Sequence, residues 1–407
     1  MVTATYIVEL ATTAGVAPTT WTDITGYVKS ISITRGRDDV LSQVQVGTAS
    51  LTLDNTSGTF SPANTFSTLY PHVAPMRAVR ITATPGVVGR LTFDQLATYT
   101  FDQIATWPLD GGLYYGYIQS ITPRPHPDAM EASIELADGM SWLDLAVDAP
   151  TYTSGLMGAQ VTNLLDTAGW AASARIIATG VLTFTPTFSG SSSVLSQLQT
   201  IVNDNEGGLV FMNGAGSIVA QDQNTRFVAP YLTSMATVTS VNDISDMDVE
   251  RHVRDIANEV TVTNNGGTVT KTDATSSTKY GPRRLGLNAA FLNGTDADDW
   301  ASWVISQKKD PKDRLRLTFI ANRSLTLLVQ AVARELSDRI TWTDVAQNTG
   351  TSGDYNIESI EHQIEAGGTY HAVTWTLSPV VPYSRQSIRV WWTLGTSTLG
   401  TGTRLAY

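Results

Sequence analysis

The stretch GTASLTLDN, residues 47–55, gives the clearest indication of the fold of this chain. Within it, residues 49–53 alternate apolar and hydroxyl side chains. A period of two is that of a β-strand with one face buried and one face in water. The stretch continues into DNTSG, residues 54–58, whose side chains favour a turn. It therefore predicts a strand of a half-buried sheet, with hydroxyl groups on the solvated face.

The same signal recurs on both sides of this stretch. Residues 27–34 place Ile31 and Ile33 on one face, and partial alternation returns in residues 78–83, 115–121 and 132–136. Several short strands at this spacing predict a barrel or a sandwich.

The middle of the chain has a different spacing of apolar residues. Residues 156–168 and 194–202 carry apolar side chains at helical spacing, and any serine of 191–193 could cap the second helix. Residues 207–220 then read as strand, glycine-rich turn and strand, which is a hairpin. We predict a small α+β domain here.

Strand patterns resume after Ile256. We expect strands at 257–263, 268–270, 339–342 and 370–377, helices from Thr295 to Lys309 and from Leu325 to Leu336, and short strands in the C-terminal segment 387–407. The chain is thus predicted to be mainly β with an α+β insert.

Composition excludes several classes of function. Charged residues are 15% of the 407 residues, against a usual ~25%, and the net charge is −11. A protein that binds DNA tightly needs rows of basic side chains on its surface. An acidic surface would instead repel the phosphates and let DNA slide past. The chain has no cysteine, so disulfides, cysteine-ligated zinc and thiol nucleophiles are excluded. We see no signal peptide and expect no membrane span.

An ordered series of local patterns carries a family resemblance. They are WTDIT (21–25), ISITRGR (31–37), GTASLTLDN (47–55), GTFSPAN (58–64), MRAVRI (76–81) and YGYI (115–118). In this order and spacing the chain resembles the hub, or minor tail, proteins at the tip of long-tailed siphovirus-type phages, notably those infecting actinobacteria. The resemblance is clearest over residues 21–145 and continues more weakly through 256–260 to Leu377.

The resemblance implies a non-enzymatic scaffold in the virion tail tip, assembled in the host cytoplasm. Such hubs resemble the baseplate hub of contractile phages, a homotrimer with two tube-like β-barrels per chain. The implied partners are the tail tube or distal tail protein, the tape measure protein, and central fibre or receptor-binding proteins, with DNA only in transit. No cofactor or metal is implied.

On this resemblance we expect four regions. Residues 1–145 form a barrel-like tube-contact domain, 146–245 the small α+β domain, 246–380 a second barrel-like domain with helices, and 381–407 a β appendage. The eight-residue repeat TFDQLATYTFDQIATW, residues 92–107, is an insertion relative to the family pattern. We interpret its aromatic pairs as an added contact surface, with sugar binding or a local core as alternatives. The pairs are Phe93 with Tyr99 and Phe101 with Trp107.

Catalytic patterns are weak. Glu358, Glu361 and Glu365 cluster, and Asp94 and Asp102 recur with the repeat, but a solvated face or turn explains such acids more simply than the paired carboxylates of a glycosidase. His362 and His371 flank a predicted turn and are expected to form a paired polar surface rather than a metal site.

Arginines stand out in so weakly charged a chain. Arg35 and Arg37 share a face of an extended strand, and either an ion pair across an interface, with Asp38 or Asp54, or a solvated edge would explain them. The full set of expected interface residues is Arg35, Arg37, Asp54, Arg77, Arg80, Phe93, Tyr99, Phe101 and Trp107.

Two other functions stay open. One is a carbohydrate-binding or glycan-cleaving tail protein that uses the aromatic repeat and the clustered acids. The other is the hexameric distal tail ring of the same kind of tail.

Overall fold

The computed structural model describes residues 2, 4–85, 111–126, 129–144, 146–148, 150–188, 191–241, 243–345, 349–381, 390–391 and 403–404. Within this part of the chain, no helix is both long and apolar enough to cross a membrane. The repeat at 92–107 and its four aromatic residues, Phe93, Tyr99, Phe101 and Trp107, lie outside the described residues.

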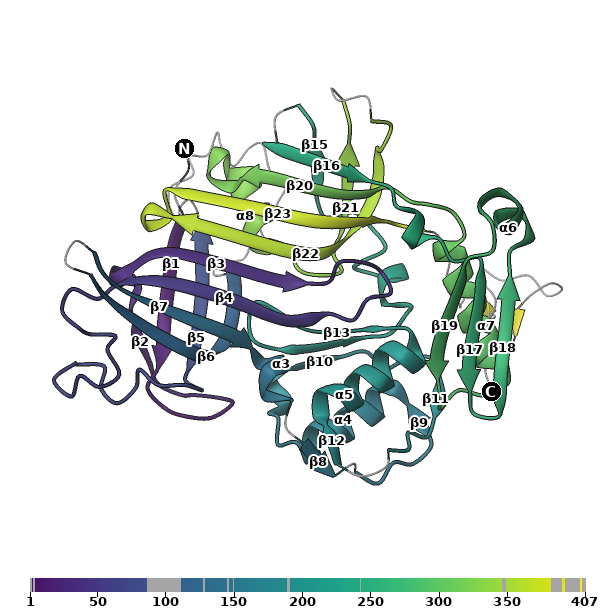
Figure 1. Ribbon diagram of the computed structural model, residues 1–407, viewed down its shortest axis with the longest axis horizontal. Coiled ribbons are helices and arrows are strands. Elements are labelled where there is room, and N and C mark those ends of the chain that lie inside the picture. Colours follow the sequence, from purple (N-terminus) through teal and green to yellow (C-terminus); the bar gives the residue numbers. More distant parts are fainter. Residues whose placement is uncertain are drawn as a thin grey trace.

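In the described part of the chain, one 13-stranded sheet dominates. Figure 1 shows its strands side by side across the upper left. All of its pairings are antiparallel except that of β15 with β21. In order across the sheet the strands are β16 (Asp246–Glu250), β20 (Arg314–Ile320), β23 (Tyr370–Pro379), β22 (Gly353–Glu365), β3 (Val28–Gly36), β4 (Gln45–Asp54), β7 (Ala129–Asp138), β6 (Gly111–His126), β5 (Ala78–Pro85), β1 (Ala4–Ala11) and β2 (Trp21–Asp23), while β21 (Arg339–Thr343) pairs with β22 and β15 (Thr237–Thr239) with β21.

The predicted strand at 49–53 is confirmed as the centre of β4. Ala49, Leu51 and Leu53 are buried, while the hydroxyls of Ser50 and Thr52 lie on the other face. The prediction of Ile31 and Ile33 on one buried face is also confirmed, because both are at most 2% exposed in β3.

The pairing of β3 with β22 joins the two ends of the chain. Ile33 lies opposite His362, and the register runs from Gly36 opposite Ser359 to Ser30 opposite Glu365. Strands from residues 1–145 and strands from residues 246–380 therefore meet in one continuous sheet.

Helix α8 (Leu325–Ala333) packs on the buried side of this sheet, against β5 and β6. The predicted helix from Leu325 is confirmed, and it starts where the Ser324 side chain accepts a hydrogen bond from the Leu327 amide. It ends at Ala333, three residues before the predicted end. The largest fully buried side chains of the core include Trp342, Trp375 and Phe319.

The small α+β region predicted at 146–245, which we call the insert, has its helices and its hairpin in the predicted order along the chain. It lies below and to the right of the main sheet in Figure 1. Ser193 caps the second of its helices by accepting from the Ser196 amide. Helix α3 (Gly139–Trp142) precedes the insert. The main elements of the insert are α4 (Met157–Thr167), α5 (Val194–Gln199), the π-helical turn η3 (Thr200–Glu206), β10 (Arg175–Ile177) and the hairpin β13 (Leu209–Met212) and β14 (Ile218–Gln221).

A smaller three-stranded sheet lies at the right of Figure 1. It consists of β18 (Gly267–Thr272), β17 (Glu259–Asn264) and β19 (Arg284–Ala289), with α7 (Gly294–Lys308) packed against it and α6 (Ala274–Tyr280) between two of its strands in sequence. The whole is mainly β with helical inserts, as predicted.

Gly36 permits the close approach of β3 to β22. Its φ is +118°, and a Cβ there would lie 2.2 Å from the carbonyl oxygen of Glu358 and 2.5 Å from the Cα of Ser359. We expect Gly36→Ala to lower the free energy of unfolding by more than about 1 kcal/mol. Urea unfolding measures this, with Gly286→Ala as control because no atom lies within 4 Å of its Cβ position. Equal stability of the two variants would contradict the prediction.

Candidate functional site, the exposed face of the main sheet

The outward face of the sheet is built mainly from hydroxyl side chains. Because successive strand residues point to opposite faces, the apolar set is buried and the Ser and Thr set is exposed. On β3, β4, β22 and β23 the outward residues are Ser30, Ser32, Thr34, Thr48, Ser50, Thr52, Ser359, Glu361, Gln363, Ala372, Thr374 and Thr376. This face is a broad polar surface.

The register aligns these side chains in rows across the strands. One row runs through Asp246, Thr318, Thr374, Glu361, Thr34 and Thr48, each on the strand next to the last. Neighbouring residues in such a row interact directly, as the 2.9 Å contact between the Thr318 and Thr374 hydroxyls shows.

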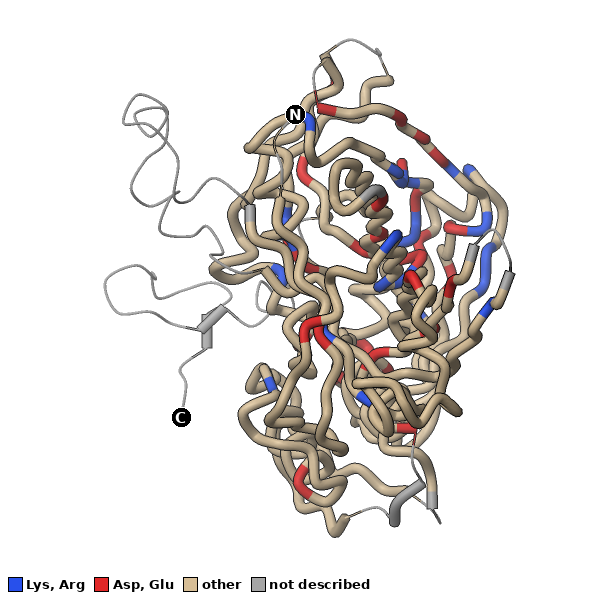
Figure 2. The backbone as a smooth tube through the Cα atoms, turned by 90° about the vertical axis from the view of Figure 1, so that its left-hand side faces the viewer, with Lys and Arg blue, Asp and Glu red and all other residues tan. Residues whose placement is uncertain are grey.

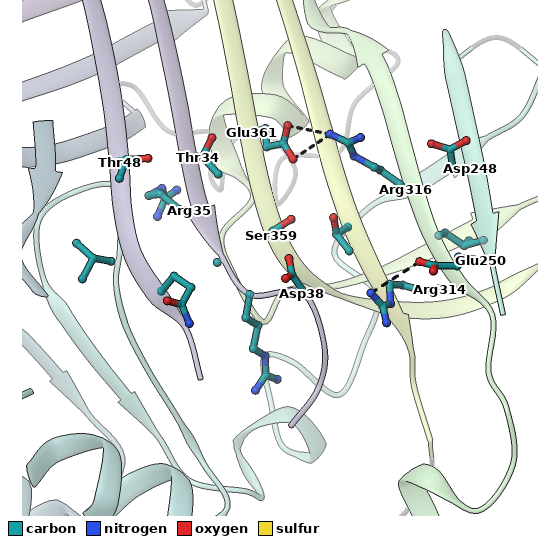
Figure 3. Close-up of a pocket in the computed structure, with 16 residues that line it drawn as sticks. Thr34, Arg35, Asp38, Thr48, Asp248, Glu250, Arg314, Arg316, Ser359 and Glu361 are labelled. Atoms are coloured by element: carbon teal, nitrogen blue, oxygen red, sulfur yellow. Dashed lines mark hydrogen bonds and ion pairs between the residues drawn. The ribbon is translucent and has the colours of Figure 1, made fainter. Parts of the chain in front are cut away.

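The face is hollowed between β4 and β16. The hollow has a volume of about 500 Å³, and side chains from six strands line it (Figure 3). Arg316 donates to both carboxylate oxygens of Glu361 at 3.0 and 3.1 Å, and Arg314 pairs with Asp255 at 3.3 Å and Glu250 at 3.9 Å. The exposed Arg316–Glu361 pair contributes about 0–1 kcal/mol, so it sets the charge of the surface more than its stability.

Acidic side chains outnumber basic ones on this face. Figure 2 shows the charged positions gathered mainly on its right, the side that faces the viewer in Figure 1. Asp246, Asp248 and Glu250 all belong to β16 at the edge of the sheet. The surface therefore has the sign that repels a nucleic acid backbone.

The three clustered glutamates do not form a glycosidase pair. Glu358 is 1% exposed and points to the buried side, whereas Glu361 points outward. Glu361 and Glu365 share the outward face, but four strand residues separate them by about 13 Å. Facing carboxylates in glycosidases are roughly 5–9.5 Å apart. Asp94 and Asp102 lie outside the described residues.

Arg35 and Arg37 are buried at 4% and 7% exposure, so the alternative of a solvated edge is wrong for both. Neither Asp38 nor Asp54 is their partner. Arg35 donates to Glu335 at 2.7 Å and to the carbonyl of Met212 at 3.2 Å, and Arg37 donates to Glu358 at 2.7 Å. These two arginines neutralise carboxylates of the same chain.

Glu358 is the centre of a buried ion cluster with Arg37 and Arg226. Arg226 donates to Glu358 Oε1 at 2.6 Å and to Oε2 at 3.1 Å. Burial alone would raise the pKa of Glu358, but the charges of Arg226 and Arg37 and their hydrogen bonds outweigh it and lower the pKa to about 2. The cluster ties β3, β22 and the insert together, and no local sequence signal marks its partners.

The other described residues of the expected interface also bond within the chain. Asp54 accepts from the backbone amide and the hydroxyl of Thr56 and so closes the predicted turn. Arg77 donates to the carbonyl of Thr12 at 3.2 Å. Arg80 pairs with both carboxylate oxygens of Glu9, and its guanidinium lies 4.4 Å from the centre of the Trp21 ring.

His362 and His371 meet across the hairpin, as expected, but they are buried at 2% and 0% exposure rather than at the surface. The Nδ1 of His362 and the Nε2 of His371 are 2.9 Å apart, and the Tyr6 hydroxyl lies 2.8 Å from the Nδ1 of His371. No group of three or more His, Asp or Glu side chains in the described part of the chain is arranged to hold a metal ion.

Burial lowers the pKa of both histidines, because the imidazolium form loses its hydration. The pKa of His371 falls to about 3. That of His362 falls well below its usual value, through burial first and then through the neighbouring His371 and Arg35. At neutral pH the pair is uncharged and forms part of the core.

No protein-family model and no curated protein matches the sequence. Solved structures of phage tail proteins do resemble this chain. A tail protein from Neisseria meningitidis MC58 aligns with a TM-score of 0.61 at 12% identity, over 93% of this chain and 98% of that one. The 43 kDa tail protein of prophage MuSo2 from Shewanella oneidensis aligns at 0.57 and 12%, over 92% and 96%.

Prophage tail protein gp18 from Listeria monocytogenes EGD-e aligns with a TM-score of 0.54 at 10% identity, over 93% of this chain and 95% of that one. All three are named as tail proteins, and at such identity the likeness shows the fold. The chain therefore has the fold of these phage tail proteins over almost its whole length.

Proposed function

We propose that the chain is a structural subunit of a phage tail tip, a hub whose copies close into a ring around a channel. In this role the ring joins the tail tube to distal fibre or receptor-binding proteins, and DNA passes through it. The similarity to three tail proteins over almost the whole chain supports a tail role. Ring formation rests on one further observation, the number of strands from the edge strand β16 to the part of β6 that pairs only with β7.

From β16 to β6 the sheet runs through β16, β20, β23, β22, β3, β4, β7 and β6, which is eight strands, each antiparallel to the next. Because eight is even, β16 and β6 run in opposite directions. A second copy, rotated about an axis along the strands, would place its β16 antiparallel to the first copy's β6. The ladder then continues from copy to copy without a parallel mismatch.

Both edges have backbone groups available for such pairing. Among the described residues, β16 pairs only with β20, and β6 beyond Ile118 pairs only with β7. Edge strands that lack a second partner are templates for pairing with another chain, and ring closure removes them. The acidic β16 would meet the β6 edge that carries Arg124.

The exposed face then lines the channel. Its Ser and Thr side chains hydrate well and offer DNA no basic stripe to bind, and the acidic excess keeps phosphates from adhering. The hollow of about 500 Å³ on this face is consistent with a concave lining. The trimer, the contacts with the tape measure and fibre proteins, and the siphovirus type belong to the same proposal.

Engineered cysteines test the ring directly, because the chain has none of its own. Asp248→Cys is combined in turn with Ser120→Cys, Thr122→Cys or Arg124→Cys, three outward positions along the free part of β6. We expect one combination to form covalent oligomers on oxidation, since the barrel stagger fixes one register. The largest covalent species gives the number of copies and separates a trimer from a hexameric ring.

The matched control combines Asp248→Cys with Thr278→Cys, which is exposed on α6 beside the smaller three-stranded sheet. A single monomer mass in light scattering, together with no more cross-linking than in this control, would overturn the proposal.

A further inference from the structure

Five exposed apolar side chains gather at one end of the main-sheet strands. β4 ends at Asp54 where β3, β7 and β23 begin, so the segments joined there lie at the same end of the sheet, on the left of Figure 1. The five residues, which we call the aromatic end, are Phe66 (96% exposed), Tyr70 (48%), Met130 (43%), Tyr370 (41%) and Tyr27 (36%).

The loop that presents Phe66 is fixed by side-chain hydrogen bonds. Asn64 accepts from the Phe66 amide at 3.1 Å and donates to the carbonyl of Gly58 at 3.0 Å. Ser67 donates to the carbonyl of Thr59 at 2.8 Å.

Below the tip, Phe60, Leu69 and Val73 are buried, and the Phe60 ring packs edge-on against Tyr27 at 5.2 Å. The loop is therefore ordered, and it exposes the phenyl ring of Phe66 to solvent. A ring held in place in this way loses little conformational entropy on binding a partner.

The other end of these strands is already covered. The loop after β3 carries Asp39, which pairs with Lys308 at the end of α7, and Arg37, which is joined through Glu358 to Arg226 of the insert. As far as the described residues show, a neighbour that prolongs the channel beyond the strand ends would therefore meet the aromatic end.

We infer that the aromatic end docks onto the next ring of the tail, with Phe66 as its anchor in an apolar socket of that ring. This inference rests on the proposed function. Copies that meet along strand edges leave the strand ends facing along the channel axis, so the occupant is the adjoining ring and not a sibling copy. Exposed apolar clusters on an ordered surface mark interaction sites, and a central aromatic side chain carries much of the affinity.

Phe66→Ser is the test, with Ile176→Ser as its matched control. Ile176 is a large apolar residue with 54% exposure, but it lies in β10 of the insert. Binding to tubes assembled from the tail-tube protein of the same phage is measured by co-sedimentation across a concentration series. We expect Phe66→Ser to weaken binding on the order of 30-fold and Ile176→Ser to leave it unchanged.

Light scattering on the same samples separates the two proposals. Rings of unchanged mass that bind tubes equally with and without Phe66 overturn this inference alone, as do wild-type rings that bind no tubes. A wild-type protein that never forms rings overturns the proposed function instead. Because Phe66 is almost fully exposed, its replacement is expected to leave the melting temperature unchanged, and this is checked on each variant.

Discussion

Replacing Glu358 with alanine is expected to lower the free energy of unfolding by about 3–5 kcal/mol, the largest effect of any single substitution considered for this chain. The carboxylate is 1% exposed and is the hydrogen-bonded partner of both Arg37 and Arg226. Without it, two guanidinium groups stay close together in a region with little water. Urea unfolding at pH 7 measures the loss.

The same strand offers a matched control. Glu361 also pairs with an arginine, Arg316, but its side chain is 38% exposed. We expect Glu361→Ala to cost less than about 1 kcal/mol. Glu358→Gln, which keeps the shape and removes the charge, should fall between the two. A cost below about 1 kcal/mol for Glu358→Ala would show that the cluster is not needed to join the insert to the sheet.

The second large effect is a loss of stability in acid caused by His362 and His371. Their pKa values are lowered in the folded state, so the neutral forms are favoured and the contribution is complete above about 6.5. As the pH falls below 6.5, the two histidines bind protons in the unfolded chain but stay neutral in the folded chain. His371, whose pKa falls to about 3, then costs about 1.4 kcal/mol per pH unit, or about 2.5 kcal/mol at pH 4.5, and His362 adds a further loss of the same sign.

Two buried carboxyls and one partly buried carboxyl act in the opposite direction. Burial raises the pKa of Asp138 to about 7 and those of Asp204 and Asp338 to about 6, so their contributions improve as the pH falls. The measurement is therefore a difference between proteins that share these carboxyls.

Wild type is compared with His362→Asn/His371→Asn, and with each single variant, by urea unfolding between pH 7.5 and 4.5. We expect wild type to lose more than about 2 kcal/mol relative to the double variant between pH 6.5 and 4.5, and about 2 kcal/mol relative to His371→Asn. Parallel curves would refute the prediction and show that the pair is protonated without penalty.

The strands and helices could be predicted from the sequence because local structure follows from side-chain periodicity. The alternation at 49–53 predicted the buried face of β4, and Ser193 emerged as the cap of α5 from three adjacent serines. It also predicted that His362 and His371 meet across a hairpin. It was wrong about their surroundings, because whether a strand face is covered depends on elements far away in the sequence.

The sequence by itself determined which segments become strands and helices, and which face of each strand is apolar. Only the tertiary structure decided three other features. They are the register between β3 and β22, the burial of Arg35 and Arg37, and the exposure of Phe66 on a loop that hydrogen bonds keep ordered. The reason is physical: alternation and capping act over a few residues, whereas Arg37 and Glu358 are 321 positions apart and no local pattern records a contact at that distance.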